Sequence, residues 1–370
     1  MRRPKSQHYE AWIVLLVVIL WMAIGLARGG AASLAPIVPE EGGQKGAVSP
    51  QARRLPDDLV AVADAKYALL DGLAPGSREA QERQRLAVQQ LGLPLEVKSA
   101  KTGIVFRLIP AGSLTMGSPR TEQDAMVRAG ARRDFVEDEI EHEVTLSKAF
   151  YCGKYEVTQG QWEQVMGTNP SYFKDAGKDA PVEQVSWSDC QAFVKKLCEM
   201  EGVPEGTYRL LTEAEWEYAC RAGTQTALYN GDLVIKGLND APALDGISWY
   251  GGNSGVEYAG GFDSSNWREK QYNHSRAGTH VVGGKQANAF GLHDMIGNGW
   301  EWCQDWYGRY ATGAVTDPLG PRSGDFRVYQ GGSWDSLAWD CWSANRYGYT
   351  PGARILNLGL RLARTMPSYP

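Results

Sequence analysis

The stretch that decides the fold of this chain is NAFGLHDMIGNGWEW, residues 288–302. It holds three glycines and two tryptophans, and the whole chain is rich in both types, with 43 glycines and 13 tryptophans. Glycine permits tight turns, and tryptophan supplies a large apolar anchor for a core. The composition therefore predicts irregular turns wrapped around aromatic side chains, with few long helices.

Short elements of regular structure are expected on both sides of this stretch. The run Ile104–Ile109, followed by Pro110–Gly112, predicts a strand that leads into a turn. Apolar residues recur at helical spacing in Ser186–Met200, which predicts an amphipathic helix. A second helix is predicted over Thr212–Ala222, because a glutamate follows the first threonine at the spacing of a capping box.

Six further blocks stand in order around residues 288–302: Leu108–Gly112 with Met116–Ser118, Tyr155–Thr158, Pro181–Trp187, Tyr208–Ala219, Gly331–Trp334 and Asn357–Arg361. Together the seven blocks resemble the formylglycine-generating enzyme (sulfatase-modifying factor) family over residues 97–365. The resemblance implies an α+β domain, the formylglycine-generating-enzyme-like variant of the C-type lectin fold, with little regular secondary structure. Leu211 and Leu360 depart from the usual Pro and Phe but stay apolar, so they affect only packing detail.

The first thirty residues have the features of an export signal. Three basic residues among the first five precede an uncharged run from Ala11 to Ala27. Seventeen helical residues span about 25 Å, slightly short of a hydrocarbon core of about 30 Å. A basic start, an apolar run and then small residues also describe a secretory signal peptide. We expect residues 1–28 to be a signal peptide or a membrane anchor, with the remainder exported to the periplasm or the cell exterior, or secreted after cleavage.

Two segments separate this export segment from the family-like domain. Residues 29–55 are rich in Ala, Gly and Pro and have no hydrophobic period, which predicts a flexible linker. Residues 56–96 contain two runs of helical periodicity separated by Pro75 and Gly76, which predicts a short helical hairpin. We interpret the hairpin as a spacer near the membrane, and a partner-binding module is the alternative.

The resemblance also implies a chemistry, for which one group is missing. Active members oxidise a sulfatase cysteine to formylglycine with dioxygen and a copper(I) ion that two thiolates hold, since soft sulfur suits Cu(I). The second of these cysteines falls on Cys341, and the first falls on Ser336. A serine hydroxyl is a hard, protonated oxygen, so copper is not expected to bind as the family binds it. The positions that line the family's substrate groove fall on Ser333, Trp300, Arg346 and Asn357.

The six cysteines include no CxxC pair, which argues against a zinc knuckle or a thioredoxin-type site. Family members that lack the full thiol pair often carry a cysteine directly after the Trp-Glu-Trp block, as Cys303 does here. The resemblance therefore implies a Cys303–Cys341 disulfide, which an exported protein can form. A reactive free thiol at Cys341 is the alternative.

Calcium is the cofactor that the resemblance supports best. The family's second calcium site maps onto Asp294, Gly297, Gly299 and Glu301, which offer two carboxylates and two glycine carbonyls within eight residues. Ca²⁺ takes six to eight oxygens of these kinds. A solvated acidic turn is the alternative interpretation. The other family site begins at Asn253 and Ser254, but its acidic position falls near Asn273 and His274, where no carboxylate stands.

Composition and motifs exclude several other functions. The net charge of −5 gives no basic surface for nucleic acid. There is no Gly-x-Ser-x-Gly elbow, no phosphate loop followed by Lys, and no metal-ligand spacing between histidines. Three hypotheses remain. The first is a non-catalytic binding or structural module of the cell envelope, with a protein, peptide or glycan as its ligand. The second is a copper-dependent formylglycine-forming oxidase, and the third is a redox enzyme with a different active site on the same fold, for which the sequence offers no residue set. The first is preferred because of Ser336.

Overall fold

The computed structural model describes residues 53–366. The predicted export segment 1–28 and nearly all of the predicted linker 29–55 lie outside these residues. Within residues 53–366, no helix combines the length and the apolar character needed to cross a membrane.

Regular elements are short and numerous. The helices of the described residues are α1 (Ser77–Leu91), α2 (Arg120–Ala129), α3 (Arg133–Val136), α4 (Gln159–Met166), α5 (Trp187–Glu201), α6 (Glu213–Arg221) and α7 (Pro242–Asp245), with 3₁₀ turns at Lys174–Ala176 and Ala338–Asp340. The strands are β1 (Leu59–Ala61), β2 (Glu96–Ser99), β3 (Val105–Ile109), β4 (Gly112–Met116), β5 (His142–Leu146), β6 (Phe150–Gly153), β7 (Tyr208–Leu210), β8 (Phe262–Asp263), β9 (Arg276–Ala277), β10 (Trp300–Trp306), β11 (Val315–Thr316), β12 (Arg327–Gln330), β13 (Arg346–Tyr349), β14 (Leu358–Gly359) and β15 (Leu362–Thr365).

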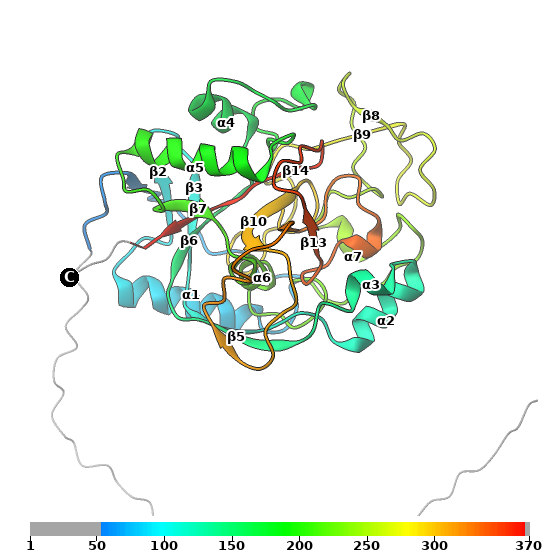
Figure 1. Ribbon diagram of the computed structural model, residues 1–370, viewed down its shortest axis with the longest axis horizontal. Helices are drawn as coiled ribbons and strands as arrows, with labels where there is room; N and C mark the ends of the chain where they lie inside the picture. The colour runs from blue at the N-terminus through cyan, green and yellow to red at the C-terminus, as the bar shows by residue number, and fades with distance from the viewer. Residues whose placement is uncertain (1–52, 367–370) are drawn as a thin grey trace, which may run out of the picture. The chain divides into compact units, whose positions relative to one another are not determined.

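A six-stranded sheet in the order β1-β2-β3-β6-β15-β7 forms the centre of the fold. All neighbours within it are antiparallel. Strand β15 lies between β6 and β7, so the C-terminal part of the described chain completes the sheet (Figure 1). A second sheet, β13-β12-β10-β14, holds the Trp-Glu-Trp block on β10, and two smaller sheets are β11-β5-β4 and β8-β9.

Strand β3 divides its side chains between two cores. Phe106 and Leu108 belong to a buried cluster that includes Phe193 of α5. Ile109 belongs to a second cluster that includes Ala80 of α1. Successive side chains of a strand point to opposite faces, which explains this division. Figure 1 accordingly shows α5 and α1 on opposite sides of the central sheet.

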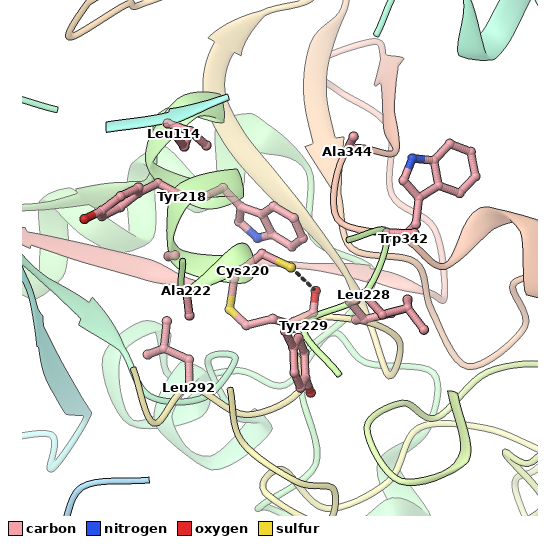
Figure 2. Packing of buried hydrophobic residues seen from close by; sticks show 14 of the residues in the cluster. Leu114, Tyr218, Cys220, Ala222, Leu228, Tyr229, Leu292, Trp342 and Ala344 are labelled. Atoms are coloured by element: carbon pink, nitrogen blue, oxygen red, sulfur yellow. Dashed lines mark hydrogen bonds between the residues drawn. The ribbon is translucent and has the colours of Figure 1, made fainter. Parts of the chain in front are cut away.

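The second cluster gathers around α6. Figure 2 shows Tyr218 and Cys220 leaving this helix in different directions, with Tyr229 beneath them and Trp342 on the far side of the cluster. Each of these four side chains is at most 1% exposed. The Cys220 thiol donates a 3.9 Å hydrogen bond to the carbonyl of Met295. Residues from loops thus anchor the irregular segments in the core, as the composition predicts.

The local elements predicted from the sequence are confirmed. Strand β3 covers the predicted run, and α5 and α6 begin directly after Ser186 and Thr212. Each N-cap hydroxyl accepts a hydrogen bond from the backbone of the third helical residue, whose own side chain accepts from the cap, so both capping boxes are complete.

The predicted helical hairpin over residues 56–96 is half wrong. Its second helix exists as α1, but its first run forms no helix. Leu59–Ala61 is strand β1, which pairs with β2 at the edge of the central sheet, and the residues from there to α1 form turns and irregular chain. The run is too short for its periodicity to separate a helix from a strand, and the free edge of β2 determines the outcome. The segment is therefore part of the domain and not a separate spacer.

A buried ion pair ties this segment to the end of the chain. The Arg364 guanidinium donates to both carboxylate oxygens of Asp58 at 2.8 and 2.9 Å, and the Tyr208 hydroxyl donates to the same group at 2.6 Å. The side chains of Asp58 and Arg364 are at most 3% exposed. Burial alone would raise the pKa of Asp58, but these hydrogen bonds outweigh it and hold the pKa below its usual value.

We expect Asp58→Asn to lower the free energy of unfolding by about 3 kcal/mol, because it leaves a buried guanidinium without its counter-charge. Urea denaturation followed by circular dichroism measures this loss. The lowered pKa means that the pair stabilises the fold above the usual aspartate value of about 4 and loses this effect as the pH falls.

Asp57→Asn is the matched control, because this neighbouring carboxylate is 93% exposed and its ion pair with Arg54 lies in solvent. Equal losses in the two variants would contradict the role assigned to Asp58.

Candidate functional site

The candidate site begins where β12 ends at Gln330. Gly331 and Gly332 both adopt positive φ, 107° and 80°, which turns the chain sharply back. A side chain at Gly332 would lie 3.1 Å from the sulfur of Cys341, so the glycine also permits close packing on this thiol. The backbone N–H of Trp334 then donates to the carbonyl of Asn298, which joins the turn to the stretch 288–302.

A hydroxyl network occupies the turn. The Ser336 hydroxyl accepts a 3.0 Å hydrogen bond from the backbone N–H of Ser333 and lies 3.1 Å from the Ser333 hydroxyl. The Ser333 hydroxyl donates to Asp335 at 2.7 Å, and the Asn357 amide donates to the same carboxylate oxygen at 2.8 Å. Burial raises the pKa of Asp335, which forms no ion pair with the part of the chain that the structure describes. The structure thus brings Ser333, Ser336 and Asn357 together.

The thiols of Cys303 and Cys341 are both free, which corrects the predicted disulfide. The Cys303 thiol donates to the amide oxygen of Gln330 at 3.4 Å, whereas the sulfur of Cys341 packs against the backbone of Gly332. Burial raises the pKa of both thiols well above the usual value, and carboxylates near each of them add to this effect. Both are therefore held as protonated thiols.

Trp300 lies in an aromatic cluster beside the turn. Its ring meets those of Tyr329 and Tyr347 edge to face at 5.1 and 5.6 Å, and Phe135 meets Tyr347 in the same way at 5.4 Å. The Tyr347 hydroxyl donates to Asp340 at 2.9 Å, and burial raises the pKa of this carboxyl to about 7. The rings of Tyr329 and Tyr347 remain partly exposed.

The guanidinium of Arg346 pairs with a buried carboxylate and not with this aromatic cluster. Its guanidinium donates to both carboxylate oxygens of Glu213, and both side chains are at most 6% exposed. Tyr307 and Tyr310 lie against the guanidinium, with ring centres 4.3 Å from its central carbon. Arg346 therefore stabilises the junction between β13 and α6 from within the core.

The predicted calcium ligands divide into two groups. Glu301 is occupied by protein partners, because Arg361 donates to both its carboxylate oxygens at 2.9 and 3.0 Å and Trp216 donates at 2.6 Å. Asp294 differs, since its Oδ2 accepts from the backbone of Gly283 but its buried Oδ1 has no partner. Only one of the two predicted carboxylates therefore has a free oxygen.

A second buried carboxylate, Glu156, lies beside Asp294. One of its oxygens accepts from Asn298 at 3.0 Å, and the other, Oε1, has no partner. Burial raises the pKa of both acids, to about 6 for Asp294. The nearby Glu301 carboxylate raises both further, and Asp294 also raises the pKa of Glu156. A side chain at Gly299 would lie 3.0 Å from Glu156 Oε1, so this glycine leaves the oxygen room.

These oxygens fit a hard cation. Two buried carboxylate oxygens without partners stand beside a glycine-rich loop, and Ca²⁺ binds carboxylate and carbonyl oxygens. Residues 53–366 contain no group of three or more His, Cys, Asp or Glu side chains arranged to hold a metal. A calcium ion here would therefore depend on the carbonyls of Gly297 and Gly299 for further ligands.

The other predicted calcium position offers no free side-chain oxygen. Asn253 accepts from the backbone of Tyr250 and donates to the carbonyl of Ser248, both at 2.9 Å. The Ser254 hydroxyl donates to the carbonyl of Trp334 at 2.6 Å. Both side chains connect loops of the protein.

Sequence reasoning missed Glu156, Asp335, Asp340 and Tyr347. Glu156 belongs to the block Tyr155–Thr158, which identified the family, but nothing local places its side chain next to Asp294. Asp335 stands between two predicted site residues, so its position in the chain was the only signal available. Asp340 lies in the 3₁₀ turn Ala338–Asp340 and Tyr347 lies on β13, so only the folded chain brings the Tyr347 hydroxyl to this carboxylate.

Comparison with known proteins places these features in a family context. Residues 95–366 match the profile of the sulfatase-modifying factor enzyme 1-like domain. Chaperone protein LppX of Paenibacillus barcinonensis is 32% identical over 269 residues, which cover 63% of this chain and 88% of that protein. Formylglycine-generating enzyme of Bos taurus is 29% identical over 314 residues, covering 69% and 73%. The solved structure of Treponema denticola variable protein 1 superposes with a TM-score of 0.55 at 30% identity, covering 73% and 99%.

We expect none of the six thiols to react with a thiol reagent such as Ellman's reagent in the native protein, because each is buried. In denaturant without reductant, all six should react, as titration at 412 nm measures. A titre of four thiols per chain would instead indicate one disulfide, as predicted for Cys303 and Cys341.

Proposed function

The chain belongs to the sulfatase-modifying factor enzyme 1-like domain family, and we propose that it is a polypeptide-binding module of the cell envelope and not a formylglycine-forming oxidase. The observation that carries this proposal is the state of Ser336. This residue is 6% exposed, and its hydroxyl is engaged by the backbone and the hydroxyl of Ser333.

The family's oxidation chemistry requires two thiolates on copper(I). In this chain one of the two positions carries Ser336, whose hard oxygen is a poor ligand for a soft ion. The other carries Cys341, which is fully buried and whose pKa is raised by burial and by two neighbouring aspartates, so the thiolate is disfavoured. Neither residue therefore favours copper.

The surface next to this turn is suited to a polypeptide. The rings of Tyr329 and Tyr347 are partly exposed, and Phe135 is 37% exposed. Asp335 and Asp340 lie beside these rings and form no ion pair within the described chain. Aromatic faces and carboxylates attract a guanidinium or an ammonium group, so a peptide with a basic residue is the preferred ligand.

The relatives support a protein partner. The Paenibacillus relative is named a chaperone protein, and the bovine relative is named a formylglycine-generating enzyme. The proposed scaffold is the family's variant of the C-type lectin fold, so a glycan remains the second ligand class to test. The second function is the copper-dependent oxidase, which the bovine relative favours.

We also propose that the chain is exported and that its N-terminal segment either anchors it in the membrane or is removed. The support is the basic start and the apolar run before residue 28. Cell fractionation that recovers the full-length chain only in the cytosol would contradict this localisation.

Calcium is the proposed cofactor. Asp294 and Glu156 would hold it through Oδ1 and Oε1, with the carbonyls of Gly297 and Gly299, while Glu301 stays paired with Arg361. When bound, the ion would neutralise two buried negative charges and fix the loop that carries Asn298, which accepts from Trp334 of the candidate site.

The functional test uses the purified full chain and two readouts. With copper(I) and a peptide that bears Cys-x-Pro-x-Arg, mass spectrometry should detect no aldehyde in the parent protein. The same peptide, labelled with a fluorophore, should bind the protein, as an increase in fluorescence anisotropy measures. Tyr347→Ala should weaken this binding about tenfold because it removes a partly exposed ring.

Leu319→Ala is the matched binding control, since this side chain is 70% exposed on a different loop. Aldehyde formation by the parent at the rate of a two-thiol relative would overturn the non-catalytic proposal. Aldehyde formation only in Ser336→Cys would support it. Absence of binding to basic peptides would overturn the polypeptide ligand.

We expect millimolar calcium to raise the melting temperature of the protein by several degrees, because binding to the native state stabilises it. Differential scanning calorimetry with calcium or with a chelator measures the difference. Glu156→Gln and Asp294→Asn should each abolish the shift. Asp263→Asn, which removes an exposed carboxylate on β8, should retain it. A melting temperature that is insensitive to calcium would contradict the proposed site.

A further inference from the structure

A pocket of about 330 Å³ lies away from the candidate site. Its lining comes from Lys66–Leu69, from Arg107 on β3, from Lys154 after β6 and from the loop that carries Gly291 and His293. Residues 66–69 precede the segment that matches the family, which begins at residue 95. The pocket therefore depends on a part of this chain that the family domain does not supply.

The floor of the pocket is a buried guanidinium. Arg107 is 1% exposed, and its Nε donates to the carbonyl of Phe290 at 3.0 Å. Its Nη1 donates to the carbonyl of Lys66 and to Glu96, both at 3.0 Å. Its Nη2 has no acceptor, although a charged donor left without one inside a protein is costly. The backbone of Gly291 covers this nitrogen, since a side chain there would lie 2.6 Å from it.

Positive charge exceeds negative charge around this floor. One oxygen of Glu96 serves both Arg107 at 3.0 Å and Lys154 at 3.1 Å. Lys66 adds a third cation at the rim and forms no ion pair with any residue of 53–366. Burial lowers the pKa of Arg107 despite Glu96, which agrees with incomplete compensation of its charge.

His293 adds a hydrogen-bond acceptor to the lining of the pocket. The Nδ1 of His293 lies 2.8 Å from the carbonyl of Lys285. Since a carbonyl only accepts, Nδ1 carries the proton, and Nε2 of the neutral ring keeps a lone pair.

We propose that this pocket binds a small hydroxycarboxylate. Its carboxylate would take hydrogen bonds from the ammonium groups of Lys154 and Lys66 and offset the charge of Arg107, and its hydroxyl would donate to Nε2 of His293. A phosphate monoester dianion carries acceptors only and leaves Nε2 without a donor. The volume lies near the lower limit for ligand pockets, which fits a molecule of a few carbons or one sugar acid.

Isothermal titration calorimetry on the full chain at about pH 8 tests this proposal with four probes: L-malate, succinate, D-glucuronate and methyl phosphate, whose dianion has no hydroxyl proton. We expect binding at one site, with L-malate tighter than succinate and methyl phosphate. Lys154→Ala should weaken malate binding about tenfold, since a charge-assisted hydrogen bond is lost. Lys98→Ala, which removes an exposed lysine on the neighbouring strand β2, is the control and should leave the affinity unchanged.

His293→Phe tests the hydroxyl, because phenylalanine retains a ring beside Tyr155 but has no acceptor. It should reduce malate affinity to that of succinate and leave succinate unchanged. Tighter binding of D-glucuronate than of L-malate would keep the ligand class and assign it to acidic sugars. Failure of both hydroxycarboxylates to bind the folded parent, or equal weakening by Lys98→Ala, would overturn the proposal, as would a preference for methyl phosphate.

Discussion

The pair between Arg361 and Glu301 is the interaction on which the rest of the structure depends. Arg361 ends the block Asn357–Arg361, and Glu301 stands inside the Trp-Glu-Trp block, so the pair joins two segments that identify the family. The same guanidinium donates to the carbonyls of Gly153 and His293, at 2.9 and 2.8 Å. Both side chains are at most 1% exposed, so the loss of hydration must be offset by this complete set of partners.

This pair also determines which carboxylates remain available at the loop 294–299. Because Arg361 and Trp216 use the oxygens of Glu301, the oxygens without partners belong to Asp294 and Glu156. Asn298 connects this acidic site to the turn at Ser333, through its amide on one side and its carbonyl on the other, and the backbone of Gly297 donates to the carbonyl of Gly331 in the same turn. A change in occupancy of the acidic site would therefore reach the candidate site through these two neighbouring residues.

The sequence was sufficient where structure is local and insufficient where it depends on distant partners. The capping boxes of α5 and α6 lie within four residues and were predicted correctly. Strand β1 was not, because Leu59 is held by pairing with Ser99, forty positions away. The family resemblance located Asp294 and Ser336, but it could not assign Glu301 to Arg361 or place Glu156 nearby. The resemblance also implied a disulfide between Cys303 and Cys341, whose thiols are both free.

If the chain resides in an oxidising compartment, its six free thiols make oxidation of the unfolded chain irreversibly damaging. No disulfide is native among them, so every bond that an unfolded molecule forms there is a wrong one, and six cysteines allow fifteen complete pairings. Oxidation would then convert transient opening into irreversible loss, and survival would be governed by the rate of unfolding. Such a chain depends on folding before it is oxidised and on a high barrier to reopening afterwards.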